Sequence, residues 1–188
     1  MKPEFKVSFW IPVFCTIKLI MKKLLIQCMI FYTFFTACEK VIDYPIVPDI
    51  RFKSAIATFA IDNLGNPVQK VELTFTLRDG DGDIGLQPGD TNPPYTGKYR
   101  SNFFPTLYIK KQGRYEKDTS VIVSNYIIPY IESRGQNPAL KADIIVEFNY
   151  SVFAGQPPKY DTIRYEFYMV DRALHHSDTL ITPDIFFR

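Results

Sequence analysis

Alternation of apolar and polar residues constrains the fold of this chain more than any other feature of its sequence. In the segment Val71–Arg78 each apolar residue is followed by a polar one. Successive side chains of a β-strand point to opposite faces of the sheet, so this pattern predicts a strand with one buried and one solvated face. The segments 143–150 and 163–170 alternate in the same way and predict two more strands.

Other segments are rich in β-branched and aromatic residues, which favour strands. No stretch shows a helical period with capping residues at its ends. Residues typical of turns, such as glycine, proline and aspartate, separate the segments. The sequence therefore predicts an all-β fold, a two-sheet sandwich of about seven antiparallel strands. The additional strands are expected near residues 50–61, 104–111, 121–128 and 179–187.

The segment Asp161–Phe167 suggests which kind of sandwich this is. It resembles the D-x-x-x-Y-x-C sequence that opens strand F of immunoglobulin-like domains, with Phe167 in place of the cysteine. The resemblance implies an immunoglobulin-like sandwich with a structural corner at Asp161 and Tyr165, where the tyrosine hydroxyl bonds to upstream backbone. An ordinary strand with an interfacial tyrosine is the alternative. In both cases Tyr165 is structural and not catalytic.

Residues 1–37 differ in composition from the rest of the chain, with five basic residues and one acidic residue. From Met21, two lysines precede the apolar run Leu24–Ala37, which is the arrangement of a secretory signal peptide. This run of 14 residues is shorter than the roughly 17–25 that a membrane-spanning helix needs. The sequence predicts a signal peptide over residues 1–37 with its biological start at Met21. An uncleaved membrane anchor and a buried core helix are the alternatives.

The end of that segment, Phe35-Thr36-Ala37-Cys38, resembles the bacterial lipobox. The resemblance implies cleavage before Cys38 and a covalent lipid on its thiol. Residues 38–48 would then form a lipidated tether, in which two prolines favour an extended course. Residues 49–188 would form the sandwich domain.

Composition excludes some classes of function for the body of the protein. Residues 38–188 carry 17 basic and 19 acidic residues, a net charge of −2, which argues against a strongly basic nucleic-acid-binding protein. Cys38 is their only cysteine, so no disulfide framework supports the domain. Neither a G-x-S-x-G nor an H-E-x-x-H motif is present. His175 and His176 are neighbours without another histidine or cysteine at a ligand spacing, and the sequence predicts no enzyme.

Three carboxylates stand within five residues directly after the strand that ends at Arg78. Glycines separate them, and a glycine-rich backbone allows the carboxylates to converge on a hard cation such as calcium. The spacing resembles the first half of an EF-hand, although Ile84 replaces the glycine that such a loop requires. A ligand from elsewhere, such as Asp171, would then complete the site. A tight turn without an ion is the alternative. The predicted calcium ligands are Asp79, Asp81, Asp83 and Asp90.

Taken together, these features resemble a group of uncharacterised lipoproteins of Bacteroidota that carry a DGDGDIG loop and a closing D-R-A-G-H-x-S-N segment. Leu174 stands where that closing segment has glycine. The resemblance implies an envelope location and a sandwich fold, and it implies no activity. The residues that carry it are Cys38, Tyr44–Ile50, Arg78–Leu86 and Val170–Thr179.

The sequence thus predicts a non-enzymatic outer-membrane lipoprotein on the periplasmic or the cell-surface face. Its sandwich would bind or scaffold an envelope protein, with the lipid anchor in the membrane, with calcium in the acidic loop and with no nucleic acid as partner. The alternative is a glycan-capturing surface lipoprotein of a polysaccharide-utilisation system, because exposed aromatic rings stack on sugars. The aromatic residues in or beside the long loop are Tyr95, Tyr99 and Phe103.

Overall fold

The computed structural model describes residues 21–27, 43–119, 125–132, 137–152 and 160–187. The chain divides into two units, Met1–Val41 and Ile42–Arg188. In the first unit, residues 21–27 are helical. Over the described residues, no helix combines the length and the apolar character needed to cross a membrane. The predicted lipid site Cys38 lies outside the described residues.

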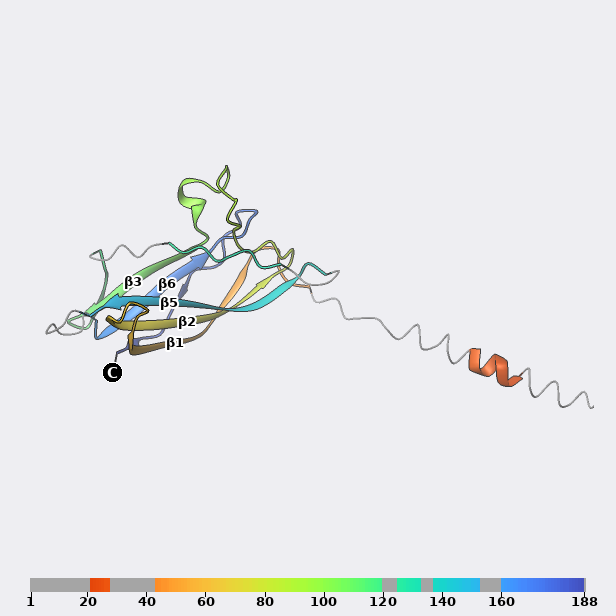
Figure 1. Ribbon diagram of the computed structural model, residues 1–188, viewed down its shortest axis with the longest axis horizontal. Helices are drawn as coiled ribbons and strands as arrows, with labels where there is room; N and C mark the ends of the chain where they lie inside the picture. Colours follow the sequence, from red (N-terminus) through yellow and green to blue (C-terminus); the bar gives the residue numbers. More distant parts are fainter. Residues whose placement is uncertain (1–20, 28–42, 120–124, 133–136, 153–159, 188) are drawn as a thin grey trace, which may run out of the picture. The chain divides into compact units, whose positions relative to one another are not determined.

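The first sheet of the second unit is antiparallel and contains two of the three alternating segments, 71–78 and 143–150 (Figure 1). Its central strand pairs Val71 with Ala57 on one side and with Phe148 on the other. A tight turn joins its first two strands, where the Asp62 carboxylate accepts the amides of Leu64 and Asn66. The strands, in sheet order, are β1 (Asp49–Ile61), β2 (Pro67–Asp79) and β5 (Leu140–Ser151).

The second sheet is also antiparallel, and the C-terminal part of the chain completes it. Two short strands, β7 and β8, pair with the same strand, β6. A single turn of 3-10 helix, η1 (Gly97–Arg100), lies in the long loop that projects beyond the strands (Figure 1). The strands are β4 (Arg114–Lys117), β3 (Phe103–Lys111), β6 (Thr162–Met169), β7 (Leu180–Ile181) and β8 (Ile185–Phe186).

The core lies between the two sheets and is built from the inward-facing residues that the alternation predicted. The Phe75 ring stacks on Phe103 with a centroid distance of 5.5 Å, and Phe167 packs against both. Every second residue of β2 from Val71 to Leu77 is fully buried. The predicted all-β fold of two antiparallel sheets is confirmed.

Two expected strands differ from those observed, and one observed strand was not expected. The described part of 121–128 contributes only an isolated bridge between Tyr126 and Phe103. The expected strand 179–187 is broken into β7 and β8, because Pro183 between them has no amide to donate to a neighbouring strand. The four-residue strand β4 was not predicted, since its charged sequence lacks alternation. The described residues contain eight strands instead of about seven.

The predicted corner has a different hydrogen bond from the one expected. Tyr165 is fully buried, and its hydroxyl bonds to the hydroxyl of Tyr150 in the opposite sheet instead of to upstream backbone. The Tyr165 ring also stacks on Phe148, with a centroid distance of 4.3 Å. The carbonyl of Asp161 accepts the Phe187 amide at 3.1 Å, so Asp161 fixes the C-terminal segment by its backbone. Tyr165 therefore links the two sheets.

Candidate metal centre

Asp79 is the last residue of β2, and the alternation of that strand determines where its side chain points. Leu77 and Asp79 lie in the same inward-facing row, which places a carboxylate at the end of an apolar series. The Asp79 residue is 0% exposed. Burial of a carboxylate away from water is costly unless a cation or hydrogen bonds compensate it. The strand thus holds a charged group at the edge of the core.

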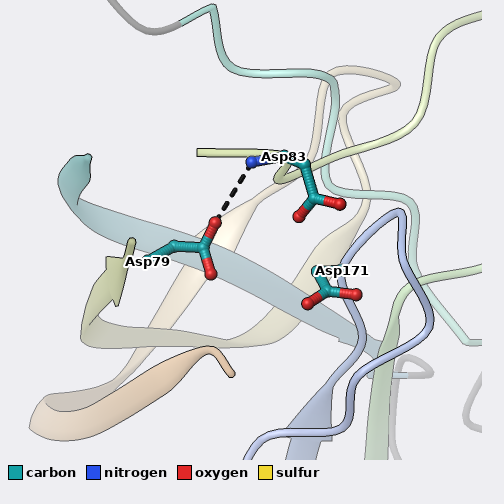
Figure 2. Close-up of side chains that lie close together, drawn as sticks. All are labelled: Asp79, Asp83 and Asp171. Atoms are coloured by element: carbon teal, nitrogen blue, oxygen red, sulfur yellow. Dashed lines mark hydrogen bonds between the residues drawn. The ribbon is translucent and has the colours of Figure 1, made fainter. Parts of the chain in front are cut away.

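Two further carboxylates meet Asp79 from other parts of the chain. Asp83 comes from the loop after β2, and Asp171 comes from the turn after β6. The three residues offer ligand oxygens that all lie within 4.8 Å of one another. Figure 2 shows the three carboxyl groups turned toward a common space. Asp171 is also almost fully buried, with 2% of its surface exposed.

The hydrogen bonds of this cluster leave two oxygens without a partner. The Asp83 amide donates to Asp79 Oδ2 at 3.1 Å, and the Ala173 amide donates to Asp83 Oδ2 at 2.9 Å (Figure 2 shows the first). The Oδ1 atoms of Asp79 and Asp83 are both buried, and neither has a hydrogen-bond partner within the described parts of the chain. Buried polar atoms are nearly always satisfied in folded proteins. The two oxygens are therefore candidate positions for a proton or a cation.

His175 holds the third carboxylate in place. Asp171 Oδ1 accepts the His175 amide at 2.7 Å, and Asp171 Oδ2 lies 2.9 Å from His175 Nδ1. Neighbouring hydrogen bonds of this kind orient carboxylates that bind metals. The side chain of His176 lies elsewhere and stacks on the Tyr168 ring with a centroid distance of 5.5 Å. The two adjacent histidines thus have different partners, as neighbours in an extended segment do.

The electrostatic environment makes these carboxylates prefer a proton or a cation. Burial, first of all, raises the pKa of Asp79 to about 7, together with the hydrogen bond and charge of Asp81 and the charges of Asp83 and Asp171. Burial also raises the pKa of Asp83 to about 6, together with the charges of Asp171 and Asp81. Raised pKa values in a buried cluster are typical of functional sites.

The structure brings together two of the four predicted calcium ligands and leaves two outside. Asp79 and Asp83 belong to the cluster, whereas Asp81 is exposed and affects it through its hydrogen bond and charge on Asp79. Asp90 forms a bidentate ion pair with Arg172, with nitrogen–oxygen distances of 2.5 and 3.3 Å, and accepts the Gln87 amide at 2.7 Å. Asp171, expected only as a supplementary ligand, is the third member.

Backbone contacts explain why the loop holds this shape. The Gly80 amide donates to Pro45 at 2.7 Å, and the Arg172 amide donates to the carbonyl of Asp83 at 3.0 Å. The Leu86 amide donates to the carbonyl of Ile128 at 3.0 Å, and further bonds join residues 84–86 to residues 130 and 131. The loop is thereby connected to the tether segment, to residues 128–131 and to the turn after β6.

Two glycines of the loop are required by close contacts. A Cβ atom on Gly80 would lie 2.3 Å from the carbonyl oxygen of Tyr44, and one on Gly85 would lie 2.2 Å from that of Pro129. Gly85 also has a φ of +97°, a conformation that residues with side chains rarely adopt. Ile84 between these positions is fully buried. The glycine-rich sequence is thus explained by packing as well as by convergence of carboxylates.

The three aromatic residues considered for glycan capture are largely engaged within the protein. Phe103 is fully buried in the core, so it cannot stack on a sugar. The Tyr95 hydroxyl donates to the carbonyl of Arg172 at 3.2 Å, and the Arg172 guanidinium lies over its ring. The Tyr99 hydroxyl lies 3.3 Å from His176 Nε2.

Comparison with known proteins finds no relative: no family model, no curated protein and no solved structure matches the chain. The case for a function therefore depends on the carboxylate cluster and on the surfaces around it. The cluster combines three converging carboxylates with two buried, unpartnered oxygens.

Proposed function

We propose that the protein is a non-enzymatic, lipid-tethered module of the outer membrane that binds calcium through Asp79, Asp83 and Asp171. The observation that carries the calcium site is the pair of buried Oδ1 atoms of Asp79 and Asp83 without a hydrogen-bond partner in the described structure. Asp171 offers a carboxylate oxygen that lies within 4.8 Å of ligand oxygens from both residues. A cation among these groups satisfies the two oxygens and compensates the burial of negative charge.

The chemistry of the donors favours calcium over softer metals. All three groups are carboxylates, and calcium takes oxygen ligands in flexible geometry, whereas zinc and copper prefer imidazole and thiolate. The nearest imidazole, that of His175, is bonded to Asp171 and supports the ligand instead of joining it. Calcium takes 6–8 oxygen ligands, so water, Asp81 and second carboxylate oxygens would supply the remaining positions.

An ion at this site would connect parts of the chain that are far apart in sequence. Asp79 ends β2, Asp83 belongs to the loop, and Asp171 follows β6. The ion would therefore tie one sheet to the other at the end where the loops gather. Its role in this proposal is to stiffen that end of a binding or scaffolding module. The immunoglobulin-like classification of the sandwich remains part of the proposal.

Thermal unfolding of the detergent-solubilised full chain tests the calcium site. Calcium is expected to raise the melting temperature of the parent protein relative to excess chelator, because a ligand that binds only the folded state stabilises it. Asp83→Asn should lose most of this shift. Asp90→Asn is the matched control, since Asp90 pairs with Arg172 outside the cluster, and it should keep the shift. Equal behaviour of the parent protein with calcium and with chelator would reject the site.

Glycan capture has less support as the alternative function. Phe103 is unavailable, and Tyr95 and Tyr99 are half-buried against Arg172 and His176. The carboxylate cluster, at the end of the sandwich where the loops gather, is consistent with a tethered protein-binding module on the periplasmic or the cell-surface face of the outer membrane. The lipid on Cys38 would supply the attachment, because each buried CH₂ of an acyl chain contributes about 0.8 kcal/mol.

A further inference from the structure

The first sheet ends in a long strand with an open edge. β5 has 12 residues and pairs with β2 along one side, and its other side pairs with no strand of the described structure. The edge of a sheet presents a row of backbone N–H and C=O groups that can pair with another extended chain. Proteins that bind peptides by strand addition use edges of this kind.

A groove of about 730 Å³ runs along this edge between β5 and residues 126–132. Every residue of β5 from Asp143 to Glu147 lines the groove. Because consecutive residues of a strand point to opposite faces, the groove lies at the edge of β5 and not over one face. Val146 and Ile128 are buried beside it. Ile145 and Ile127 are 59% and 58% exposed at its rim. The groove thus combines an unpaired backbone with apolar side chains.

The wall of the groove opposite β5 is held firmly. The Asn102 side chain accepts the Ile128 amide at 2.6 Å and donates to the Ile128 carbonyl at 3.0 Å. The loop after β2 adds hydrogen bonds from Tyr130 and Ile131 to residues 86 and 84. A preformed wall reduces the ordering that binding requires and so favours affinity.

The charges around the groove select among extended partners. Its lining in the described structure includes the acidic residues Glu132, Asp143 and Glu147 and no basic residue. Lys53 of β1 and Lys70 of β2 pair with Asp143 and Glu147 across the outer face of the first sheet, and the two carboxylate side chains are 45% and 49% exposed to solvent. Exposed ion pairs are weak, so an incoming basic side chain can share the same carboxylates.

We propose that this groove binds an extended protein segment that pairs with the open edge of β5. The segment would place apolar side chains between the sheets at alternate positions and basic side chains beside Asp143 and Glu147 on the outer face. This partner follows from the groove's negative lining, apolar floor and open backbone edge. The proposal goes beyond the calcium site and does not depend on it.

The probe is a fluorescent peptide about six residues long that alternates valine with lysine and has blocked ends. Its anisotropy is measured with the full chain in detergent, where saturable binding is expected. A peptide with glutamate in place of lysine should bind about tenfold more weakly or less. Two further peptides carry N-methyl groups on one or the other set of alternate amides. Only the set that faces β5 should be sensitive, because methylation removes its hydrogen-bond donors.

Surface substitutions on the protein complete the experiment. Ile145→Lys should weaken peptide binding by about tenfold or more, because Ile145 lies on the outer face between Asp143 and Glu147, and a lysine there repels the lysines of the peptide. Ile181→Lys is the matched control, since Ile181 is 60% exposed on β7 in the other sheet, and it should leave binding unchanged. Absence of saturable binding, or equal sensitivity to both methylated peptides, would overturn strand addition. The chain itself could also self-associate through this groove. If it does, and if Ile145→Lys abolishes that self-association, the groove binds a second copy of the chain, and the proposal of a basic partner segment is overturned.

Discussion

At the scale of single residues, the unusual feature is a carboxylate in a row of core side chains. Asp79 continues the buried series of β2, yet one of its oxygens has no hydrogen-bond partner in the described structure. A buried donor or acceptor without a partner costs about 1–3 kcal/mol. Without an ion, the folded protein is therefore less stable than its packing permits. A proton or a cation relieves this cost, and these two compete for the same oxygens.

This competition predicts a pH dependence of stability in the absence of calcium. Folding raises the pKa of Asp79 from 3.8 to about 7 and that of Asp83 to about 6. The protonated carboxyls therefore stabilise the folded state at low pH, and this stabilisation is lost as the pH rises through those values. With chelator present, the free energy of unfolding should fall between about pH 4 and 7, that is, between the unfolded and the folded pKa values, measured by denaturant titration.

The same titration has two controls. Asp79→Asn should flatten the fall, because the amide does not ionise. Asp178→Asn changes an exposed carboxylate outside the cluster and should leave it unchanged. Asp184, whose pKa its partners Tyr115, Lys110 and Arg164 lower to about 2, titrates below this window and does not interfere. A free energy that rises with pH in the parent protein would contradict the assignment of the raised pKa values.

The hydroxyl pair between the sheets gives a second prediction at this scale. Tyr165→Phe should cost about 1 kcal/mol of unfolding free energy, since it leaves the buried Tyr150 hydroxyl without its partner. Tyr150→Phe should cost a similar amount, and the double substitution should cost less than the sum of the two. Additive losses in this double-mutant cycle, measured by chemical denaturation, would show that the hydroxyls do not interact.

At the scale of elements, the loop after β2 acts as a connector between distant segments. It bonds to the tether segment at Pro45, to residues 128–131 and to the turn after β6. In that turn, Leu174 has a φ of +68°, a conformation in which glycine is more stable. Leu174 therefore occupies a position at which glycine would be less strained.

The close contacts of this loop predict how substitutions of its glycines change the stability of the protein. Gly85→Ala should lower the free energy of unfolding by about 2 kcal/mol or more, because the new Cβ meets the Pro129 carbonyl and the backbone is in a left-handed conformation. Gly89→Ala should change it by less than about 0.5 kcal/mol, since nothing lies within 4 Å of that Cβ. Equal stabilities of the two variants in denaturant titrations would show that the contact at Gly85 yields without cost.

The sequence predicted the long strands well and the candidate site only in part, for a physical reason. Alternation is local, so β2 and its inward row, including Asp79, follow directly from the residues. The carboxylate cluster forms through contacts between residues far apart in the sequence. The EF-hand spacing predicted Asp90 as a ligand because it assumes that all ligands come from one continuous loop. The ion pair of Asp90 with Arg172 joins residues 82 positions apart, which no spacing rule reveals. The wall of the groove depends in the same way on Asn102 and Ile128.

At the scale of the whole molecule, the described sandwich carries two separate surfaces. The acidic cluster lies where the loops of both sheets meet, and the groove lies along the open edge of β5. The core needs no disulfide, because aromatic packing between the sheets supplies its interior. A lipid on Cys38 would concentrate both surfaces at a membrane.

The tether prediction concerns Cys38 alone. Palmitate labelling of cells that express the protein should label the parent chain, and Cys38→Ala should abolish both labelling and cleavage of the signal segment. Cys28→Ala is the matched control, because it removes a cysteine from the same region without touching the lipobox. Labelling that persists in Cys38→Ala would show that the lipid is elsewhere or that the segment is an anchor of another kind.

Isothermal titration of the detergent-solubilised full chain with calcium measures binding at the carboxylate cluster. We expect saturable binding of one ion per chain, lost in Asp171→Asn and retained in Asp178→Asn. Asp171 is the ligand that distinguishes the observed cluster from a loop that binds through neighbouring residues alone. Undiminished binding in Asp171→Asn, or no binding heat in the parent protein at any of several temperatures, would contradict the account.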